Sequence, residues 1–171
     1  MNTSEFKQKV FMFSEQLYPM VYRMLGNRQT AEDAIQDIML KLWLKRKKIA
    51  DHPNLKGLIV LTARNHCIDV LRRRMKVVSI PDEQIKDEKS HQQDSRLEWQ
   101  HLNNAITSIL KNVPEQQREV FLMRDIDGYA YKDIAFALNI TIEHCRVLLS
   151  RVRQFIAEEL EKNYQYERGT Y

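Results

Sequence analysis

The sequence has little glycine and little proline, with 4 of each among 171 residues. A sheet of many strands needs turns rich in these residues, so helices are the better expectation. There are 2 cysteines, far apart and outside any CxxC pair, so a disulfide framework is not expected and a reducing compartment fits. No window holds the roughly 18 apolar residues that cross a bilayer, and the N-terminus lacks a signal-peptide pattern. These absences favour a cytoplasmic, all-α protein.

Motifs of catalysis and metal binding are also missing. The sequence contains no GxSxG, no P-loop, no GxGxxG and no HExxH. Neither His66-Cys67 nor His144-Cys145 has a third ligand at a suitable spacing. We therefore expect no enzymatic activity, no metal site and no cofactor.

Charge is unevenly distributed along the chain. The 27 lysines and arginines outnumber the 23 acids, for a modest net charge of +4. Basic residues concentrate at 45–48 and 72–76, whereas acids dominate 81–98. Separated basic clusters favour a polyanionic partner such as nucleic acid. Solvated helix ends would explain either cluster taken alone.

Apolar residues at helical spacing predict three helices in the N-terminal half. The first covers Phe6 to Leu25, the second is capped by Thr30, and the third covers about 55–74. Residues 77–95 lose this spacing and are polar, which predicts a flexible linker. The sequence thus predicts a first helical bundle over residues 1–76.

Helical spacing resumes beyond the linker and predicts a second bundle over 96–163, followed by a tail at 164–171. Pro114 suits the first turn of a helix, and Asp127-Gly128 predicts a turn. Two shorter helices are expected over about 131–138 and 141–161. The overall prediction is two small helical bundles joined by a flexible linker.

The last two predicted helices have the pattern of a helix-turn-helix. Ala135 is small where two helices cross closely, Asn139 tolerates the left-handed backbone of the turn, and Thr141 can cap the second helix. Cys145 is expected in the core rather than as a reactive thiol. The outward positions suit a DNA major groove: Thr141, Glu143, His144, Arg146, Val147, Ser150, Arg151 and Arg153. An ordinary helical hairpin, with surface arginines, is the alternative.

Two ordered motifs carry a family resemblance. Residues 113–121, with Asp127-Gly128 and 133–135, resemble the LPxxxREVF…G…EIA pattern of sigma region four. Residues 31–37 and 63–73 resemble the AEDxxQE and ARNxxxDxLRR patterns of sigma region two. Found in this order without a third domain, they are similar to bacterial sigma factors of the extracytoplasmic-function (ECF) group within the sigma-70 family.

The resemblance implies a role for each group of residues. Core RNA polymerase would be bound through its clamp helices and flap, with the clamp facing Glu32, Asp33, Gln36 and Asp37; the same acids could instead compensate a helix dipole. The −10 element would be held by Arg64, Asn65, Arg72, Arg73 and Arg74, although Asn65 could also be a plain surface amide. The −35 element would be read by the outward residues of the helix-turn-helix. An anti-sigma factor is a further implied partner.

The sequence also departs from the family pattern. Leu58 and Val60 stand where aromatic residues are usual, so base stacking near the melted strand is in doubt. Glu143 adds an acid to the recognition helix, and Leu148 replaces a usual arginine there. The −35 sequence preference therefore cannot be transferred. A stand-alone helix-turn-helix regulator is the rival function, and stable binding of the isolated chain to an operator would favour it.

Overall fold

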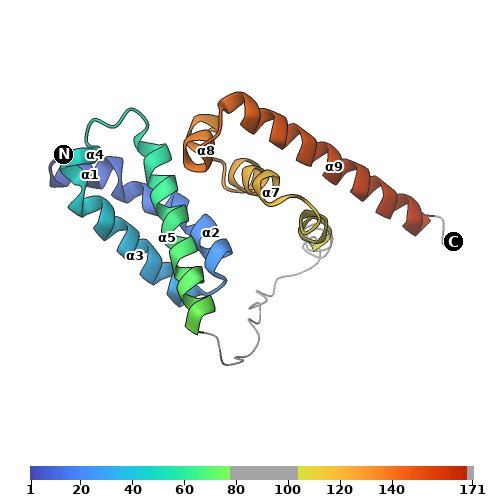
Figure 1. Cartoon of the computed structure of the whole chain (residues 1–171), viewed down its shortest axis with the longest axis horizontal. Coiled ribbons are helices and arrows are strands. Elements are labelled where there is room, and N and C mark those ends of the chain that lie inside the picture. Colours follow the sequence, from blue (N-terminus) through green and yellow to red (C-terminus); the bar gives the residue numbers. More distant parts are fainter. Residues whose placement is uncertain (78–103, 169–171) are drawn as a thin grey trace.

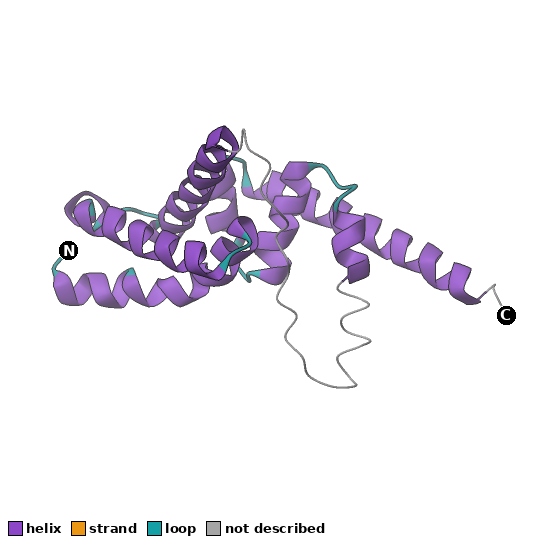
Figure 2. Ribbon diagram, turned by 90° about the horizontal axis from the view of Figure 1, so that it is seen from below, coloured by secondary structure: helices purple, strands orange, loops and turns teal. Residues whose placement is uncertain are grey.

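The computed structural model describes residues 1–77 and 104–168 (Figure 1). Every regular element within these residues is a helix, and no strand occurs among them (Figure 2). The predicted all-α fold is confirmed. Most of the predicted linker and the expected start of the second bundle lie outside the described residues.

The N-terminal half is a bundle in which three long helices bury a common core. Leu17, Val21, Ile38, Ile59 and Val60 have no exposed surface, and each comes from a helix whose apolar residues recur on one face. The elements, in chain order, are α1 (Thr3–Lys9), η1 (Phe11–Phe13), α2 (Ser14–Leu25), α3 (Arg28–Leu44), α4 (Arg46–Ile49) and α5 (Leu55–Val77).

Two predictions about this half were wrong in detail. The first helix is not continuous, because the backbone leaves helical geometry at Val10, with φ −122°. Helical spacing persists across the break since α1 and α2 bury the same core. The cap of α3 is Asn27, not Thr30: Asn27 is extended, and its side chain accepts a hydrogen bond from the Thr30 N–H at 3.0 Å. Gly26 at φ 69° ends α2 directly before it, so one tight corner serves both helices.

The C-terminal half contains a helical segment at 104–110 and then a compact set of short helices before one long helix. Pro114 is the N-cap of the first of them, one residue before the first turn in which it was predicted. Gly128 turns the chain at φ 74°. The named elements are α7 (Glu115–Phe121), the π-helical turn η2 (Leu122–Ile126), α8 (Tyr131–Leu138) and α9 (Ile142–Arg168).

The two halves are in contact. Helix α8 packs along α5, and this is the most extensive contact between any two of the described elements (Figure 1). Buried residues of both halves form one continuous apolar cluster. No described helix is long and apolar enough to span a membrane.

Candidate nucleic-acid interface

The turn between α8 and α9 has the geometry of a helix-turn-helix. Asn139 adopts the left-handed conformation, with φ 54° and ψ 49°. The Ile140 N–H donates to the Ala135 carbonyl at 3.0 Å, which closes α8 in a Schellman-type cap. The Thr141 hydroxyl then accepts from the His144 N–H at 3.0 Å and caps α9. These contacts fix the direction in which α9 leaves the turn.

The start of α9 presents one face to the core and another to solvent. Cys145 and Leu149 are buried, and burial raises the pKa of the Cys145 thiol, which agrees with a core position. Leu148 is also buried, at 4% exposure, so its replacement of a usual arginine takes nothing from the outer face. All the residues predicted to face DNA are exposed: Thr141, Glu143, His144, Arg146, Val147, Ser150, Arg151 and Arg153.

The arginines of this face differ in their interaction partners within the protein. Arg153 forms a bidentate ion pair with Asp125, with Nε–Oδ2 at 2.9 Å and Nη2–Oδ1 at 2.7 Å. The hydrogen bond that Arg153 donates to Asp125 raises the pKa of Arg153. Arg146 lies over the Tyr131 ring at 5.5 Å. Arg151 makes no ion pair with any described residue, so it is the arginine most available to a phosphate.

Helix α5 presents a second exposed polar face. Asn65, Asp69, Arg72 and Arg73 are all exposed, at spacings of four, three and one residues that keep them on one side of the helix. Arg72 Nη1 lies 3.9 Å from Asp69 Oδ1, consistent with Asp69 orienting the arginine. Val60, by contrast, is fully buried and cannot stack on a base.

Two arginines predicted to hold the −10 element are engaged inside the protein. Arg74 donates to the Leu25 carbonyl at 3.3 Å and also to the Thr30 hydroxyl, so it braces the corner between α2 and α3. Arg64 forms a bidentate pair with Glu119 of α7, at 3.0 and 2.9 Å. In this state neither guanidinium is free for a phosphate.

Helix α3 carries the predicted acidic face. Glu32, Asp33, Gln36 and Asp37 are all exposed. The helix begins at Arg28 and has no acid in its first turn, so compensation of the helix dipole, which falls off within one turn, explains little of this pattern. The acids instead form a continuous solvent-facing stripe.

Two apolar residues that the sequence reading missed extend this stripe. Leu40 and Leu44 are 55% and 71% exposed, and they follow Gln36 at steps of four residues. The signal was visible in the sequence as leucines outside the buried stripe of α3. Trp43 packs edge-on against Phe6, with the ring centroids 5.0 Å apart, and so belongs to the core side of the helix. An acidic stripe that ends in exposed leucines fits a protein partner better than a nucleic acid.

A buried histidine lies behind the acidic stripe. His66 is 7% exposed, with Nδ1 2.6 Å from the Lys41 ammonium and Nε2 3.8 Å from Asp37 Oδ2. Burial first, and then the Lys41 charge, lower the pKa of His66. An accepting Nδ1 places the proton of the neutral ring on Nε2, facing Asp37.

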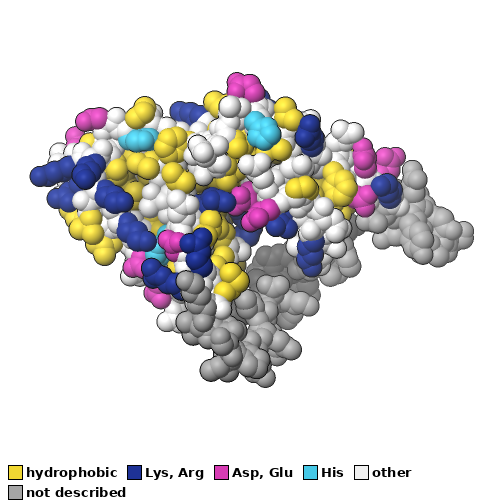
Figure 3. All heavy atoms as spheres, in the orientation of Figure 1, with side chains coloured by type: hydrophobic (Ala, Val, Ile, Leu, Met, Phe, Trp, Pro, Cys, Tyr) yellow, Lys and Arg dark blue, Asp and Glu magenta, His cyan; other side chains and the backbone are white. Residues whose placement is uncertain are grey.

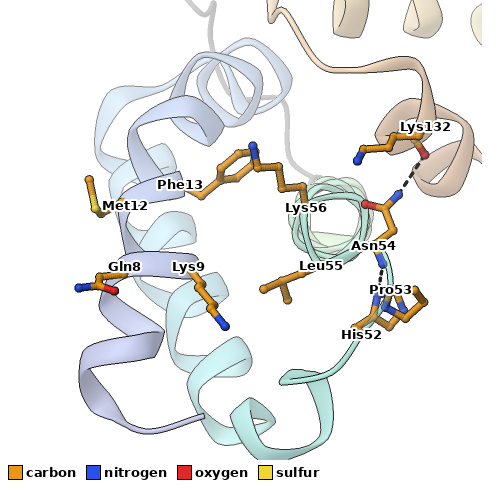
Figure 4. A pocket seen from close by; sticks show the side chains of 10 residues that line it. All are labelled: Gln8, Lys9, Met12, Phe13, His52, Pro53, Asn54, Leu55, Lys56 and Lys132. Atoms are coloured by element: carbon orange, nitrogen blue, oxygen red, sulfur yellow. Dashed lines mark hydrogen bonds between the residues drawn. The ribbon is translucent and has the colours of Figure 1, made fainter.

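A positively lined cleft lies where the two halves meet (Figure 4). It has a volume of about 480 Å³, and lysines from α1, α5 and α8 surround it. No acidic residue lines it, and none of the lysines has an ion-pair partner among the described residues. Its lining comprises Gln8, Lys9, Met12, Phe13, His52, Pro53, Asn54, Leu55, Lys56 and Lys132.

Asn54 at the edge of this cleft is a further residue that the sequence reading missed. Its Oδ1 accepts from the Gly57 N–H at 2.9 Å and so caps α5. Its Nδ2 donates to the Lys132 carbonyl of α8 at 3.1 Å. Gly57 makes room for this arrangement, because a Cβ there would lie 2.5 Å from Asn54 Nδ2. No local pattern announces the second bond, since Lys132 is distant in the chain.

Fold and surface together define a helical protein with a helix-turn-helix and a separate exposed acidic stripe that ends in leucines. Residues 12–77 match the family described as Sigma-70 region 2, and residues 103–162 match the one described as Sigma-70, region 4. The chain belongs to the sigma-70 family, in its ECF group. No group of three or more residues able to hold a metal occurs among the residues described.

Curated relatives and solved structures agree with this assignment. The chain is 24% identical over 143 residues to the ECF RNA polymerase sigma factor SigM of Bacillus subtilis (strain 168), covering 84% of this chain and 87% of SigM. It is 22% identical over 166 residues to SigW of the same organism, covering 91% and 88%. Its fold is similar to that of the sigma factor RpoE from Bartonella quintana, solved with the anti-sigma factor NepR (TM-score 0.63, 22% identity, 93% and 98% covered). It is also similar to CnrH, solved with the cytosolic domain of CnrY (TM-score 0.64, 18% identity, 94% and 90% covered).

Proposed function

We propose that this chain directs promoter-specific transcription initiation as an ECF sigma factor, by binding core RNA polymerase, capturing the −10 element and reading the −35 element. The observation that carries the proposal is the helix-turn-helix, with a left-handed Asn139 and an exposed basic start of α9, on the same chain as a region-two bundle. Family membership supports the same conclusion.

The start of α9 is proposed to read the −35 element in the major groove. Exposed Glu143, His144 and Val147 would face base edges, while Arg146 and Arg151 would hold phosphates. Glu143 is repelled by phosphate and can accept from a cytosine amino group, so it would favour particular bases rather than raise affinity. Arg153 contributes less than its position suggests, because Asp125 already neutralises it.

The exposed face of α5 is proposed to capture the −10 element as a single strand. The Asn65 amide can read the Watson–Crick edge of an unstacked base. Arg72 and Arg73 would hold the neighbouring phosphates. Because unstacking a base costs a few kcal/mol, this face must supply contacts that the duplex does not offer.

The stripe on α3 is proposed to bind the clamp helices of the polymerase. Carboxylates of Glu32, Asp33 and Asp37 can pair with arginines of a partner helix. Leu40 and Leu44 would supply the apolar centre that such interfaces need, since burying exposed leucines stabilises a complex more than rim charges do.

An anti-sigma factor is proposed as the negative partner. The similar structure of RpoE from Bartonella quintana was solved with the anti-sigma factor NepR. The lysine-lined cleft would accept an acidic segment, because its lining includes Lys9, Lys56 and Lys132 and no acidic residue. Its lining belongs to the N-terminal half except for Lys132 of α8, so a bound segment that reaches Lys132 would touch both halves.

Reconstitution with sigma-free core polymerase tests the proposal. We expect a stable complex and run-off transcripts from members of a promoter library. Arg146→Ala should lower promoter binding and transcript yield, whereas Lys162→Ala, on the same helix but beyond the reading face, should not. A chain that never associates with core polymerase would refute the proposed function.

A further inference from the structure

Two bidentate ion pairs join the halves, and in both the N-terminal half contributes the arginine. Arg64 of α5 pairs with Glu119 of α7, and the two side chains are 21% and 24% exposed. Arg23 of α2 pairs with Asp127, and its Nη2 donates to Asp127 Oδ2 at 2.8 Å. Figure 3 shows acidic and basic side chains meeting where the halves touch. Parallel N–H···O bonds of this kind are among the stronger and more directional polar contacts in proteins.

The second pair is the more enclosed. The Asp127 side chain has no exposed surface, and that of Arg23 is 28% exposed. Beside it, the Tyr129 hydroxyl donates to the Gln16 carbonyl at 3.1 Å; burial raises the pKa of Tyr129, so the hydroxyl keeps its proton. If Arg23 moved away, the buried Asp127 carboxylate would lose this ion pair. A buried charge without a partner strongly destabilises the folded arrangement. The Asp127 contact therefore favours the state in which the halves stay together.

We propose that the pairs Arg64–Glu119 and Arg23–Asp127 form a latch that keeps the chain closed and inactive until it is opened. The proposal rests on the proposed function. In the closed state the Arg64 guanidinium donates both hydrogen bonds to Glu119, as it would to a DNA phosphate. Arg64 directly precedes Asn65, which is proposed to read the −10 strand. Helix α7 thus competes directly with the −10 strand for α5.

Geometry also requires the latch to open before both promoter elements are bound. The −10 and −35 elements are about 25 base pairs apart, which is roughly 85 Å of B-DNA. In the closed state α5 and α8 are packed together. The 26 residues of 78–103 can span at most about 90 Å when fully extended. The covalent connection therefore permits the separation, and the latch opposes it.

The Arg23–Asp127 pair provides the cleaner test, because neither residue belongs to the proposed DNA-binding face. Opening can be followed by energy transfer between dyes at Lys48→Cys on α4 and Glu158→Cys on α9, both exposed positions. The two native thiols, Cys67 and Cys145, are buried and should not compete for dye. Affinity for core polymerase is measured on the same labelled chains.

Asp127→Asn should shift the chain to low energy transfer and raise its affinity for core polymerase roughly tenfold, the factor that corresponds to about 1.4 kcal/mol. Glu119→Gln should act in the same direction. The exchange Arg23→Asp with Asp127→Arg should restore the closed state. Lys162→Gln removes an ion pair confined to α9 and should change neither readout.

If Asp127→Asn left energy transfer at the wild-type value, the latch would be overturned. It would also be overturned if the variant opened without gaining affinity for core polymerase. Thermal melting distinguishes opening from unfolding, since an opened chain keeps cooperative transitions for its bundles. Failure of the wild-type chain to bind polymerase would instead refute the proposed function, while the energy-transfer measurement would still report on the latch.

Discussion

Asp125 neutralises Arg153, and this leads to an unequal contribution of two neighbouring arginines to DNA binding. Both side chains are exposed on α9, and a count of basic residues would treat them alike. Arg153 is held by two hydrogen bonds to Asp125, whereas Arg151 has no ion-pair partner among the described residues. Arg151→Ala should therefore remove a phosphate contact, and Arg153→Ala should remove little.

The magnitude follows from counterion release. Each phosphate contact contributes a slope of about −0.9 to log affinity against log salt. When salt rises from 50 to 200 mM, the affinity of a variant that lacks one phosphate contact should therefore fall by a factor about 3.5 times smaller than the wild-type affinity does. Arg151→Ala should show this change. Arg153→Ala should keep the wild-type slope and cost at most about 1 kcal/mol of stability, because the Arg153 side chain is 54% exposed and its ion pair is screened by solvent.

The assay is fluorescence anisotropy of the polymerase holoenzyme on a −35 duplex at several salt concentrations. Asp125→Asn is the informative companion variant: it frees Arg153 and should steepen the slope by up to about 0.9. If Arg153→Ala flattened the slope as much as Arg151→Ala, the Asp125 pair would not withhold Arg153 from DNA, and the reasoning would be refuted.

Three further outcomes are expected. Leu44→Asp, at a position 71% exposed, should weaken core polymerase binding at least tenfold (roughly 1.4 kcal/mol) without lowering the melting temperature; unchanged affinity would remove Leu44 from the interface. Burial and Lys41 hold the pKa of His66 below its ordinary 6.5, so the imidazole takes up a proton more readily in the unfolded chain than in the folded one. The contribution of His66 to the free energy of unfolding is therefore fully present above about pH 6.5 and is lost as pH falls. Urea unfolding from pH 7.5 to 5.5 should show the loss, and His66→Gln should reduce it. Burial raises the pKa of Cys67 to about 11, so Ellman's reagent at pH 8 should react with it only after unfolding; rapid native labelling would contradict its buried position.

The closed state gives the two kinds of proposed partner opposite effects. A ligand that binds only the open chain, such as polymerase with promoter DNA, has to offset the latch and the α5–α8 packing. A ligand that fits the cleft between the halves would stabilise the closed chain by the same linkage. The latch thus sets how strongly an anti-sigma segment must bind to silence the protein.

Local pattern in the sequence was enough to predict most of the helices and the outward faces of α3 and α9. Asn139 in a left-handed turn and Thr141 as a cap depend only on residues within a few positions, and the exposed residues of α9 follow from helical spacing. For the same reason, the stripe of acids on α3 and the turn at Gly128 were predictable.

Tertiary structure alone decided which of the predicted charges are free. Arg64 and Arg153 form ion pairs within the protein and Arg74 donates to a carbonyl and a hydroxyl, and the Arg64 partner is 55 residues away along the chain. Val10 breaks a helix whose spacing continues, since apolar periodicity records which face is buried and not whether the axis is straight. Helical spacing cannot state how two bundles meet, because that depends on contacts such as Arg23–Asp127, 104 residues apart. The sequence determined the two modules and their outward faces, and only the packing of one half against the other decided that Glu119 of α7 engages Arg64 of α5.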